Sequence, residues 1–368
     1  MKKIIKYRNL KIDNKFALTL NVKFKKFLKS GQYLPGLKLK EFENTIAKYC
    51  HRKYCIAVSS GTTALYLALK SINLPKGSEI ICPAISWIAT AHAIVMAGYK
   101  PVFVDVNFDQ TISLNSFKSA INKKTKALML VHFKGILGDI FSIIKEAKKN
   151  NIIIIEDAAQ AFGAKKKNKI AGSFGDLATF SFNPMKVFGG FGEGGAVLTD
   201  SKKENIKLRK MRDLGLNQID RERTDLFELN YKFDELQAIL LIEQLKFYKK
   251  QMNIRKNLIK EYKKKLKSLV INSDYDTTNS SGYDYQILVK KRNSLRKYLT
   301  KKNIETRIKH PILIPYQNIY KKFRRLPLKN AEKIVKQSIS LPLHSYLNKT
   351  SIEFISNNIK SFYANFKK

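Results

Sequence analysis

Seven short apolar segments recur along the first 200 residues, and helical patterns separate most of them. The expected strands are 55–58, 80–82, 102–106, 127–131, 152–156, 178–182 and 195–199, with helices at 62–72, 86–97, 114–121 and 139–149. Apolar strands that alternate with helices form a mostly parallel sheet covered on both faces. We therefore expect an α/β fold with a seven-stranded sheet, and functional residues at the carboxyl ends of its strands.

The rest of the chain predicts a second, smaller domain. At 368 residues the chain is long enough for about two domains. A lysine-rich helical pattern begins at residue 246 and is followed by an expected strand at 283–289, a helix at 292–303, and a further strand and turn at 304–312. We expect a large domain over 1–249 and a smaller α+β domain over 250–368.

Lys186 occupies a special place between two of the expected strands. The strands 178–182 and 195–199 enclose it, and Pro184 and several glycines predict a tight irregular loop around it. A loop lysine held away from bulk solvent has a lowered pKa, which suits it to form a Schiff base with an aldehyde. The alternative, in a chain with many lysines, is an ordinary solvated side chain.

Three other strand ends carry candidate ligand groups. Gly61, Thr62 and Thr63 follow the first strand and open a helix, so their N–H and hydroxyl groups suit a phosphate; the alternative is an ordinary helix N-cap. Asp157 ends an apolar strand, where its carboxylate must find a cation or hydrogen-bond donors, or cap the next helix. Trp87, the single tryptophan, follows another strand and either stacks on a planar ligand or packs in the core.

Composition narrows the class of protein. The formal charge of +41 is typical of proteins that bind nucleic acid. The lysines are spread along the whole chain, however, so we favour a bias toward lysine in the overall composition as the explanation of the charge. Three cysteines without metal-ligand spacing predict neither a disulfide framework nor a metal site. No apolar run is long enough to span a bilayer, and no signal peptide is recognised. We expect a cytoplasmic protein with no membrane span.

The strand ends of one sheet are expected to carry a phosphate cradle, a carboxylate, an aromatic ring and a loop lysine. These four groups together are typical of a site for pyridoxal 5'-phosphate. Here the sequence resembles the DegT-type family of sugar aminotransferases that depend on this cofactor, with the aspartate-aminotransferase-like fold. The likeness runs from about residue 30 to beyond 345. It is carried by YLPGLKLKEFE, VSSGTTALYLAL, IICPAISWIATAHAI, KPVFVDV, IIIIEDAAQAFGA, GSFGDLATFSFNPMK, GEGGAVLTD, NYKFDELQA and SLPLHSYL.

The resemblance implies a role for each matching residue. Lys186 would form the Schiff base and move the proton, Asp157 would pair with the pyridinium nitrogen, and Gln160 would contact the phenolic oxygen. Trp87 would stack on the ring. The phosphate would be held by Thr62, Thr63 and Ser181 of one subunit, where Gly61 allows the backbone to approach closely, and by Asn230 of the partner. A homodimer with shared sites is therefore implied; for Asn230 the alternative is a turn residue that opens the next helix.

Some residues depart from the family's pattern. Asn183 stands where the family frequently has histidine, and Lys232 where arginine is usual. Both lie where substrate is expected, so they bear on specificity. His132 and His310 match family positions and are either functional or structural.

The reaction implied is a ping-pong transamination. An amino acid, by resemblance glutamate, would leave its amine on the cofactor as pyridoxamine 5'-phosphate, and a keto-sugar attached to a nucleotide would accept it. The product would be an amino-deoxy sugar for surface polysaccharide or for glycosides. One alternative is the family's dehydratase branch, but that branch has histidine in place of the lysine. Another, from a different class, is a basic nucleic-acid-binding regulator, which only the charge supports.

Overall fold

A seven-stranded sheet forms the centre of the computed structural model, which describes residues 4–270 and 279–365. The strands, in spatial order, are β1 (Tyr54–Val58), β9 (Gly195–Thr199), β8 (Leu177–Ser181), β5 (Ile153–Asp157), β4 (Thr125–Val131), β2 (Glu79–Pro83) and β3 (Lys100–Val104). Only β9 runs antiparallel to its neighbours. All seven strands expected from the apolar segments are therefore present, and the mostly parallel α/β fold is confirmed.

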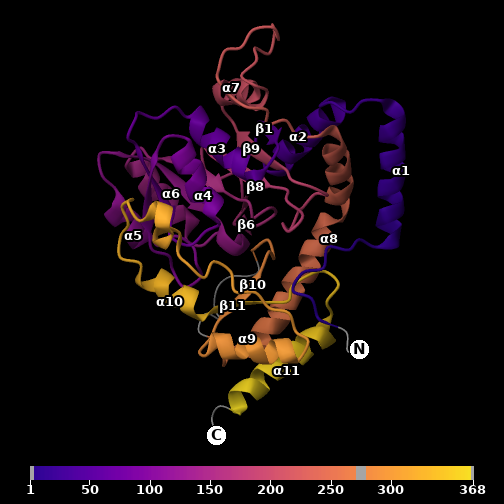
Figure 1. Ribbon diagram of the computed structural model, residues 1–368, viewed down its shortest axis with the longest axis vertical. Helices are drawn as coiled ribbons and strands as arrows, with labels where there is room; N and C mark the ends of the chain where they lie inside the picture. The colour runs from indigo at the N-terminus through magenta and orange to yellow at the C-terminus, as the bar shows by residue number, and fades with distance from the viewer. Residues whose placement is uncertain (1–3, 271–278, 366–368) are drawn as a thin grey trace.

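Helices cover both faces of this sheet (Figure 1). One face packs against α2 (Leu37–Tyr49), α5 (Leu114–Ala120), α6 (Ile140–Lys149) and the start of α8 (Glu235–Leu266). The other packs against α3 (Gly61–Ser71), α4 (Ile88–Met96), α7 (Lys202–Arg212) and α10 (Lys329–Gln337). Successive residues of β5 belong to opposite layers, Ile154 to the first and Ile155 to the second, because side chains alternate along a strand.

A second apolar core lies in the C-terminal part of the chain. The two-stranded antiparallel sheet of β10 (Tyr285–Leu288) and β11 (Ser338–Leu341) packs there with α9 (Arg292–Lys301), α11 (Lys349–Ala364) and the end of α8. Helix α8 is continuous across the predicted boundary at residue 249, so that boundary stays a prediction. The chain's start also joins this part, since Ile5 pairs with Ile304.

One expected strand is wrong. Residues 304–312 form no strand, and only isolated bridges are present, from Ile304 to Ile5 and from Arg307 to Ser340. This segment makes single contacts with two different segments, each too short to build a ladder.

Two further elements lie at the periphery (Figure 1). Helix α1 (Asn14–Ser30) lies alongside α8 and contacts it through Phe16 and Leu20, which pack on Leu240. The segment between α7 and α8 projects from the end of the molecule opposite the C-terminal part. The remaining elements are the hairpin of β6 (Lys165–Lys166) and β7 (Lys169–Ile170) and the 3-10 turns η1 (Phe133–Gly135), η2 (Ile314–Tyr316) and η3 (Asn318–Tyr320).

Within the part of the chain that the structure describes, no helix is long and apolar enough to cross a bilayer. The same residues contain no cluster of three or more histidine, cysteine or acidic side chains arranged for a metal ion.

Candidate active site

A cavity of about 950 Å³ opens at the carboxyl ends of the sheet strands, between the sheet and the C-terminal part. Seven of the nine residues predicted for the site line it: Gly61, Thr62, Trp87, Asp157, Gln160, Ser181 and Lys186. They come from β1, β2, β5 and β8 or from the segments directly after these strands. The fold therefore gathers residues that lie up to 125 positions apart in the sequence.

Lys186 is half-buried at the wall of this cavity, on the loop between β8 and β9. Its backbone N–H donates to the carbonyl of Asn183 at 2.9 Å, and the loop returns to the sheet where Gly190 N–H donates to the carbonyl of Phe182 at 2.6 Å. A Cβ on Gly189 would lie 2.6 Å from the oxygen of Asn183. The tight loop therefore requires glycine there, and it fixes the backbone from which the lysine side chain extends.

Asp157 presents its carboxylate to the cavity from the end of β5. The side chain is 6% exposed, and its Oδ2 accepts a hydrogen bond from the Thr90 hydroxyl at 2.8 Å. Its Oδ1 accepts a longer one from Ala159 N–H at 3.3 Å. Thr90 is held in turn by the hydroxyl of Ser86 at 2.7 Å. No basic side chain of the described residues forms an ion pair with Asp157, which leaves the carboxylate able to pair with a cationic ligand group.

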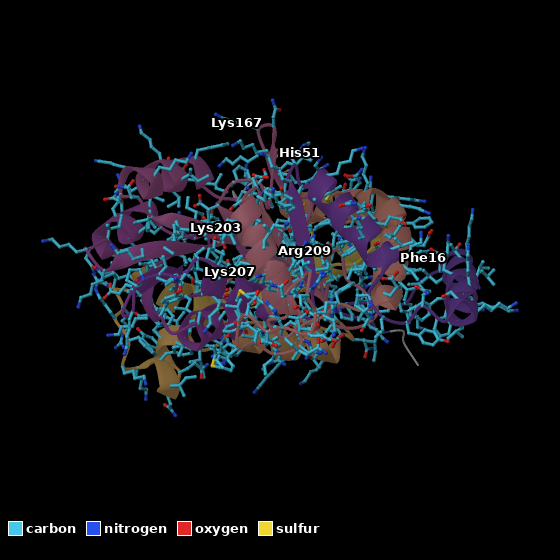
Figure 2. All side chains as sticks on the ribbon, turned by 90° about the horizontal axis from the view of Figure 1, so that it is seen from above. Phe16, His51, Lys167, Lys203, Lys207 and Arg209 are labelled. Atoms are coloured by element: carbon cyan, nitrogen blue, oxygen red, sulfur yellow. The ribbon has the colours of Figure 1, made fainter. Side chains whose placement is uncertain are left out.

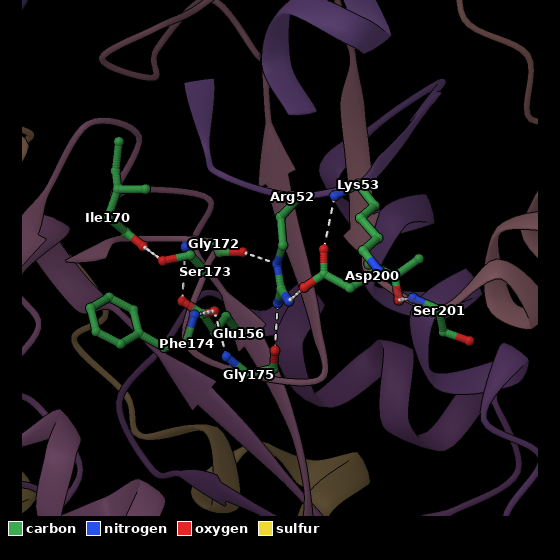
Figure 3. A network of polar contacts seen from close by, with 11 residues as sticks. Arg52, Lys53, Glu156, Ile170, Gly172, Ser173, Phe174, Gly175, Asp200 and Ser201 are labelled. Atoms are coloured by element: carbon green, nitrogen blue, oxygen red, sulfur yellow. Dashed lines mark hydrogen bonds and ion pairs between the residues drawn. The ribbon is translucent and has the colours of Figure 1, made fainter. Parts of the chain in front are cut away.

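Glu156, the neighbouring carboxylate, lies in the opposite layer and does not line the cavity. Figure 3 shows it beside the loop at residues 172–175. It is fully buried, where it contacts His132 Nε2 at 2.8 Å and accepts from the N–H groups of Phe174 at 2.6 Å and Gly175 at 2.8 Å. Burial alone would raise the pKa of Glu156, but His132 and the N–H groups of Gly175 and Gly172 outweigh it and lower that pKa below 4.5. Glu156 therefore has a structural role, whereas His132, which pairs with it, also lines the cavity.

The start of α3 makes a cradle with β8 and β9. A Cβ on Gly61 would lie 2.5 Å from the Cβ of Ser181, and one on Gly195 would lie 2.3 Å from the carbonyl oxygen of Ser60. Only glycine fits at these two places. The first turn of a helix also leaves N–H groups without intrahelical partners, and these favour an anion. The cradle, with the Ser181 and Thr62 side chains in the cavity lining, thus fits a phosphate.

Gln160 and Trp87 both line the cavity. The Gln160 side-chain oxygen accepts from the backbone N–H of Lys134 at 2.7 Å, so the amide is held in one orientation. Trp87 is 58% exposed and makes an edge contact with His310, with ring centroids 5.8 Å apart. An aromatic ring that is half-covered beside a cavity retains a face for a planar ligand.

Thr63 and Asn230 lie outside this cavity. The Thr63 hydroxyl contacts the hydroxyls of Ser60 at 2.9 Å and Ser59 at 3.2 Å, and its N–H donates to Ser60 at 3.0 Å. These contacts serve to cap α3. Asn230 is exposed near the projecting segment, where its side-chain oxygen accepts from Lys232 N–H at 3.1 Å. The structure therefore does not bring either residue to the cavity of its own chain.

Sequence reasoning missed one group of cavity residues. Arg8, Tyr283 and Lys309 line the cavity, and Lys309 forms an ion pair with the buried carboxylate of Asp284 at 3.1 Å. The Tyr283 ring lies 4.5 Å from Lys309 Nζ, 5.0 Å from the Arg8 guanidinium and 5.8 Å from Lys186 Nζ. No local motif marks these residues, because bridges between distant segments bring them together.

The electrostatics of this group affect Tyr283. Burial raises the pKa of a phenol, but the positive charges of Lys309, Lys186 and Arg8 outweigh it, and the pKa of Tyr283 lies below 10.0. Burial also raises the pKa of Asp284, whereas Lys309 and Arg8 lower it to a net value below 3.8. Arg8 and Lys309 therefore bring positive charge to the part of the cavity lining that contains Tyr283.

The model of the DegT/DnrJ/EryC1/StrS aminotransferase family matches residues 17–360. The chain belongs to this family. It is 32% identical over 333 residues to UDP-2-acetamido-2-deoxy-3-oxo-D-glucuronate aminotransferase from Pseudomonas aeruginosa, covering 89% of this chain and 91% of that protein. It is 30% identical over 347 residues to a protein from Geobacillus stearothermophilus named pleiotropic regulatory protein, covering 92% and 93%.

The solved structures agree with this membership. The E. coli GDP-4-keto-6-deoxy-D-mannose-3-dehydratase with bound hydrated PLP superposes with a TM-score of 0.87, at 26% identity, over 97% of this chain and 100% of that one. The resemblance to a family of PLP-dependent aminotransferases is confirmed, as is the aspartate-aminotransferase-like architecture.

The structure shows where Asn183 and Lys232, the two residues that depart from the family's pattern, lie. Asn183 lines the cavity beside Lys186, and its amide donates to the carboxylate of Glu193. Lys232 lies outside the cavity, where it forms an ion pair with Asp213 at 2.9 Å. His310 lines the cavity, and burial lowers its pKa to about 4, so it is neutral at pH 7.

Proposed function

We propose that this protein is a PLP-dependent aminotransferase that moves an amino group from an amino acid to a keto-sugar linked to a nucleotide. The observation that carries the proposal is the convergence of Lys186, the Asp157 carboxylate and the helix cradle at Gly61 in one cavity. Family membership supports it, and so does the name of the Pseudomonas relative, which is a nucleotide-sugar aminotransferase. Glutamate is the expected donor, and an amino-deoxy sugar for polysaccharide or glycoside synthesis is the expected product.

The cavity residues fit the cofactor's three recognition groups. The cradle of Gly61, Thr62 and Ser181 suits the phosphate, because a Cβ at Gly61 would fill the space that the approach needs. Asp157 suits the ring nitrogen, because its carboxylate has hydrogen-bond donors but no basic partner. Gln160 is held in one orientation for the phenolic oxygen.

In the reaction, Lys186 holds the cofactor and then moves protons. When bound, the cofactor supplies an aldehyde that takes up the amine and a ring that accepts electrons from the neighbouring carbon. Lys186 Nζ accepts the proton released from the α-carbon of the amino donor, and Asp157 keeps the ring nitrogen protonated. Trp87 limits water at the exposed side of the ring. The donor leaves as its 2-oxo acid, and the amine passes to the keto-sugar in the second half of the cycle.

Lys186 also favours this reaction over dehydration. In the family's dehydratase branch a histidine stands at the lysine position, so the proton-transfer group differs. A lysine that lines the cavity from the loop between β8 and β9 has both functions that transamination requires, covalent attachment and proton transfer.

We further propose a homodimer whose cofactor sites are shared. Asn230 lies outside its own chain's cavity, and the segment around it exposes large apolar side chains, with Phe227 fully exposed and Ile219 98% exposed. Beside them, a groove of about 590 Å³ is lined by Tyr66, Met96 and Leu229. Such a patch on a soluble enzyme marks an interface with another chain, here a second copy. We also propose that the enzyme is cytoplasmic and that its chain forms two domains, over 1–249 and 250–368.

The positive charge does not favour a nucleic-acid-binding function. In Figure 2, side chains with nitrogen tips project from many parts of the molecule's outline. A charge spread in this way gives solubility and weak attraction to polyanions, whereas a nucleic-acid site gathers its basic side chains on one face. Salt-dependent retention on unrelated DNA by a protein without cofactor absorbance would reverse this conclusion.

The deciding experiment incubates the holoenzyme with glutamate and a panel of keto-sugar nucleotides, and identifies products by mass spectrometry. We expect one member of the panel to gain an amine while 2-oxoglutarate accumulates. Lys186→Ala is the matched control and should give neither product. Loss of a hydroxyl from the sugar without amination would instead establish the dehydratase reaction.

A further inference from the structure

Tyr283 brings a phenol to the large cavity from the segment just before β10. This segment is tied to the sheet side of the cavity, because the Ser281 hydroxyl donates to the carbonyl of Gln160 at 2.6 Å and Ser281 N–H donates to that of Gly135 at 3.1 Å. The carbonyl of Tyr283 itself accepts a hydrogen bond from the Arg8 guanidinium. The backbone that carries the phenol is therefore held on both sides, and the side chain is 9% exposed.

The Tyr283 ring lies close to the amine of Lys186. The Nζ of Lys186 is 5.8 Å from the ring centroid, and both side chains line the same cavity. Within the described part of the chain, the Tyr283 hydroxyl forms no hydrogen bond, since the contact with Arg8 involves the backbone carbonyl. A phenol can both donate and accept a hydrogen bond, so this hydroxyl is available to a ligand in the cavity.

Positive charge surrounds this phenol. The Nζ of Lys309 lies 4.5 Å and the Arg8 guanidinium 5.0 Å from the ring centroid. Burial raises the pKa of Tyr283, and the Asp284 carboxylate adds to this effect. The charges of Lys309, Lys186 and Arg8 outweigh both, so that this pKa lies below 10.0. A phenol whose anion is stabilised in this way gives up its proton more readily than an ordinary tyrosine does.

The neighbouring groups of the cavity that carry protons are less suited to give one up. The Tyr7 hydroxyl donates to Asp284 at 3.0 Å, and burial together with that carboxylate raises the pKa of Tyr7 to about 12. Burial and the charge of Lys309 lower the pKa of His310 to about 4, so it is a neutral imidazole and a weak acid at pH 7. Burial also lowers the pKa of Lys309, but its ion pair with Asp284 outweighs burial and raises that pKa.

We propose that the Tyr283 hydroxyl gives a proton to the carbonyl oxygen that leaves the keto substrate as water, and takes one from water when the 2-oxo acid forms. This inference rests on the aminotransferase function and adds a catalytic residue to it. The carbon that loses or gains this oxygen is also the carbon at which Lys186 Nζ moves a proton. Because Tyr283 and Lys186 lie together in the cavity, one can act on the oxygen while the other acts on the carbon.

The step balances in protons and electrons. When the carbonyl carbon takes up an amine, its bond to oxygen breaks with the electron pair on oxygen, and the nitrogen's lone pair forms a carbon–nitrogen double bond. Tyr283 Oη gives one proton to the leaving oxygen and recovers the proton that the nitrogen loses. The two hydrogens of the amine thus leave in one molecule of water, and no oxidant or reductant is needed.

The first test titrates the phenols of the cofactor-free protein by their ultraviolet absorbance. The difference between the titrations of the wild type and Tyr283→Phe should be a single transition with its midpoint below pH 10. Tyr298→Phe is the matched control, because it removes a phenol on α9 that does not line the cavity, and it should retain this transition. A midpoint at pH 10 or above for the phenol lost in Tyr283→Phe would overturn the proposal.

The second test separates the two proton transfers by incubating the holoenzyme with glutamate in heavy water. Exchange of the α-hydrogen needs Lys186 only, so deuterium should enter glutamate at the wild-type rate in Tyr283→Phe. Release of 2-oxoglutarate also requires water to add at that carbon, and the variant should release it more slowly by roughly two orders of magnitude. Phenylalanine keeps the ring and its packing, and equal melting temperatures would establish that the variant is folded.

The outcomes separate this inference from the function on which it rests. If Tyr283→Phe exchanges deuterium and releases 2-oxoglutarate at the wild-type rates, the phenol is only part of the cavity wall, and the aminotransferase function stands. Equal slowing of exchange and release would also contradict the proposal, because it would indicate a role in binding or in positioning Lys186. If the wild type neither exchanges nor releases with glutamate or any other amino acid, the aminotransferase function itself fails.

Discussion

Glu156 and Asp157 are adjacent carboxylates at the end of β5 that face opposite layers of the protein. Asp157 lines the large cavity and accepts from the Thr90 hydroxyl, whereas Glu156 is enclosed with His132 and backbone N–H groups. The alternation of side chains along a strand produces this division. One residue is therefore available to a ligand, and the other stabilises the loop at residues 172–175 (Figure 3).

Asp157→Asn should impair catalysis without unfolding the protein. A neutral amide cannot balance a protonated ring nitrogen, so electron withdrawal by the cofactor is lost, and we expect turnover to fall by roughly two orders of magnitude or more. The Thr90 hydroxyl still has an acceptor in the variant, so the melting temperature should change little. Steady-state kinetics and calorimetry measure the two effects. Wild-type turnover in this variant would remove Asp157 from the proposed site.

Glu156→Gln should have the opposite profile, with lower stability and milder loss of turnover. The charge that the His132 ring and the backbone donors stabilise is lost, which we expect to reduce the free energy of unfolding by about 2 kcal/mol. Because the folded-state pKa of Glu156 lies below 4.5, its contribution is complete above that pH and is lost as the pH falls through the folded value. Urea unfolding at pH 7 and near pH 3 should therefore show a smaller acid destabilisation in the variant than in the wild type.

Lys186→Ala should abolish covalent attachment of the cofactor. Borohydride reduction followed by peptide mapping should place the label on Lys186 in the wild type and nowhere in the variant. Turnover should fall by roughly three orders of magnitude or more, because the nucleophile and the proton-transfer group are the same side chain. Lys203→Ala, on the exposed face of α7 (Figure 2), is the control and should retain both label and activity. A label on any other lysine would contradict the assignment.

Gly61→Ala should weaken cofactor binding. The added Cβ would lie 2.5 Å from the Cβ of Ser181, so α3 or β8 must move and the cradle widens. We expect the cofactor's dissociation constant to rise by about tenfold or more, which corresponds to about 1.4 kcal/mol. Combining the change with Ser181→Gly relieves the contact but removes a phosphate ligand, so recovery should be partial. An unchanged dissociation constant in Gly61→Ala would mean that the phosphate binds elsewhere.

The sheet and the helices that cover it were predictable, because the strands are short apolar segments and the helices have apolar residues at helical spacing. Both patterns can be recognised within a short stretch of sequence. Lys186, Asp157 and Gly61 were predictable for a related reason: the carboxyl ends of parallel strands lie at one edge, so residues that follow each strand lie together. Arg8, Tyr283 and Lys309 carry no such signal. They reach the cavity through the pairing of Ile5 with Ile304 and the packing of the C-terminal part, contacts between segments almost 300 residues apart.

The same distinction explains the one expected strand that is absent, and it bears on two expectations that stay predictions, the domain boundary at residue 249 and the role of Thr63. The expected strand at 304–312 does not form because, among the described residues, no neighbouring segment runs beside it for long enough to build a ladder. The predicted boundary at residue 249 lies inside α8, because a lysine-rich surface pattern does not interrupt a helix whose apolar side chains continue to pack. Thr63 shares a motif with Thr62, yet its hydroxyl turns back to Ser60, a difference that depends on the helix cap and not on residue type.

The last prediction concerns the proposed shared site. Asn230 lies outside the cavity of its own chain, near an apolar segment in which Phe227 is fully exposed. If a second copy covers that segment, Asn230 can reach the partner's phosphate cradle. Sedimentation should then find a dimer, and Phe227→Asp should weaken it, because burying an unpaired carboxylate at the interface is unfavourable. The matched change Phe354→Asp, at a half-exposed position on α11, should leave the dimer intact.

Mixing two impaired variants tests the sharing itself. Lys186→Ala and a strongly impaired Asn230 variant are combined, allowed to exchange subunits, and assayed. In a mixed dimer with shared sites, one site carries both changes and the other carries neither, so activity should return to about half of the wild-type value per mixed dimer. If Asn230 serves its own chain, every site keeps one change and no activity returns. Absence of recovery despite demonstrated exchange would leave Asn230 as a turn residue before α8, in keeping with the hydrogen bond that its side chain accepts from Lys232 N–H.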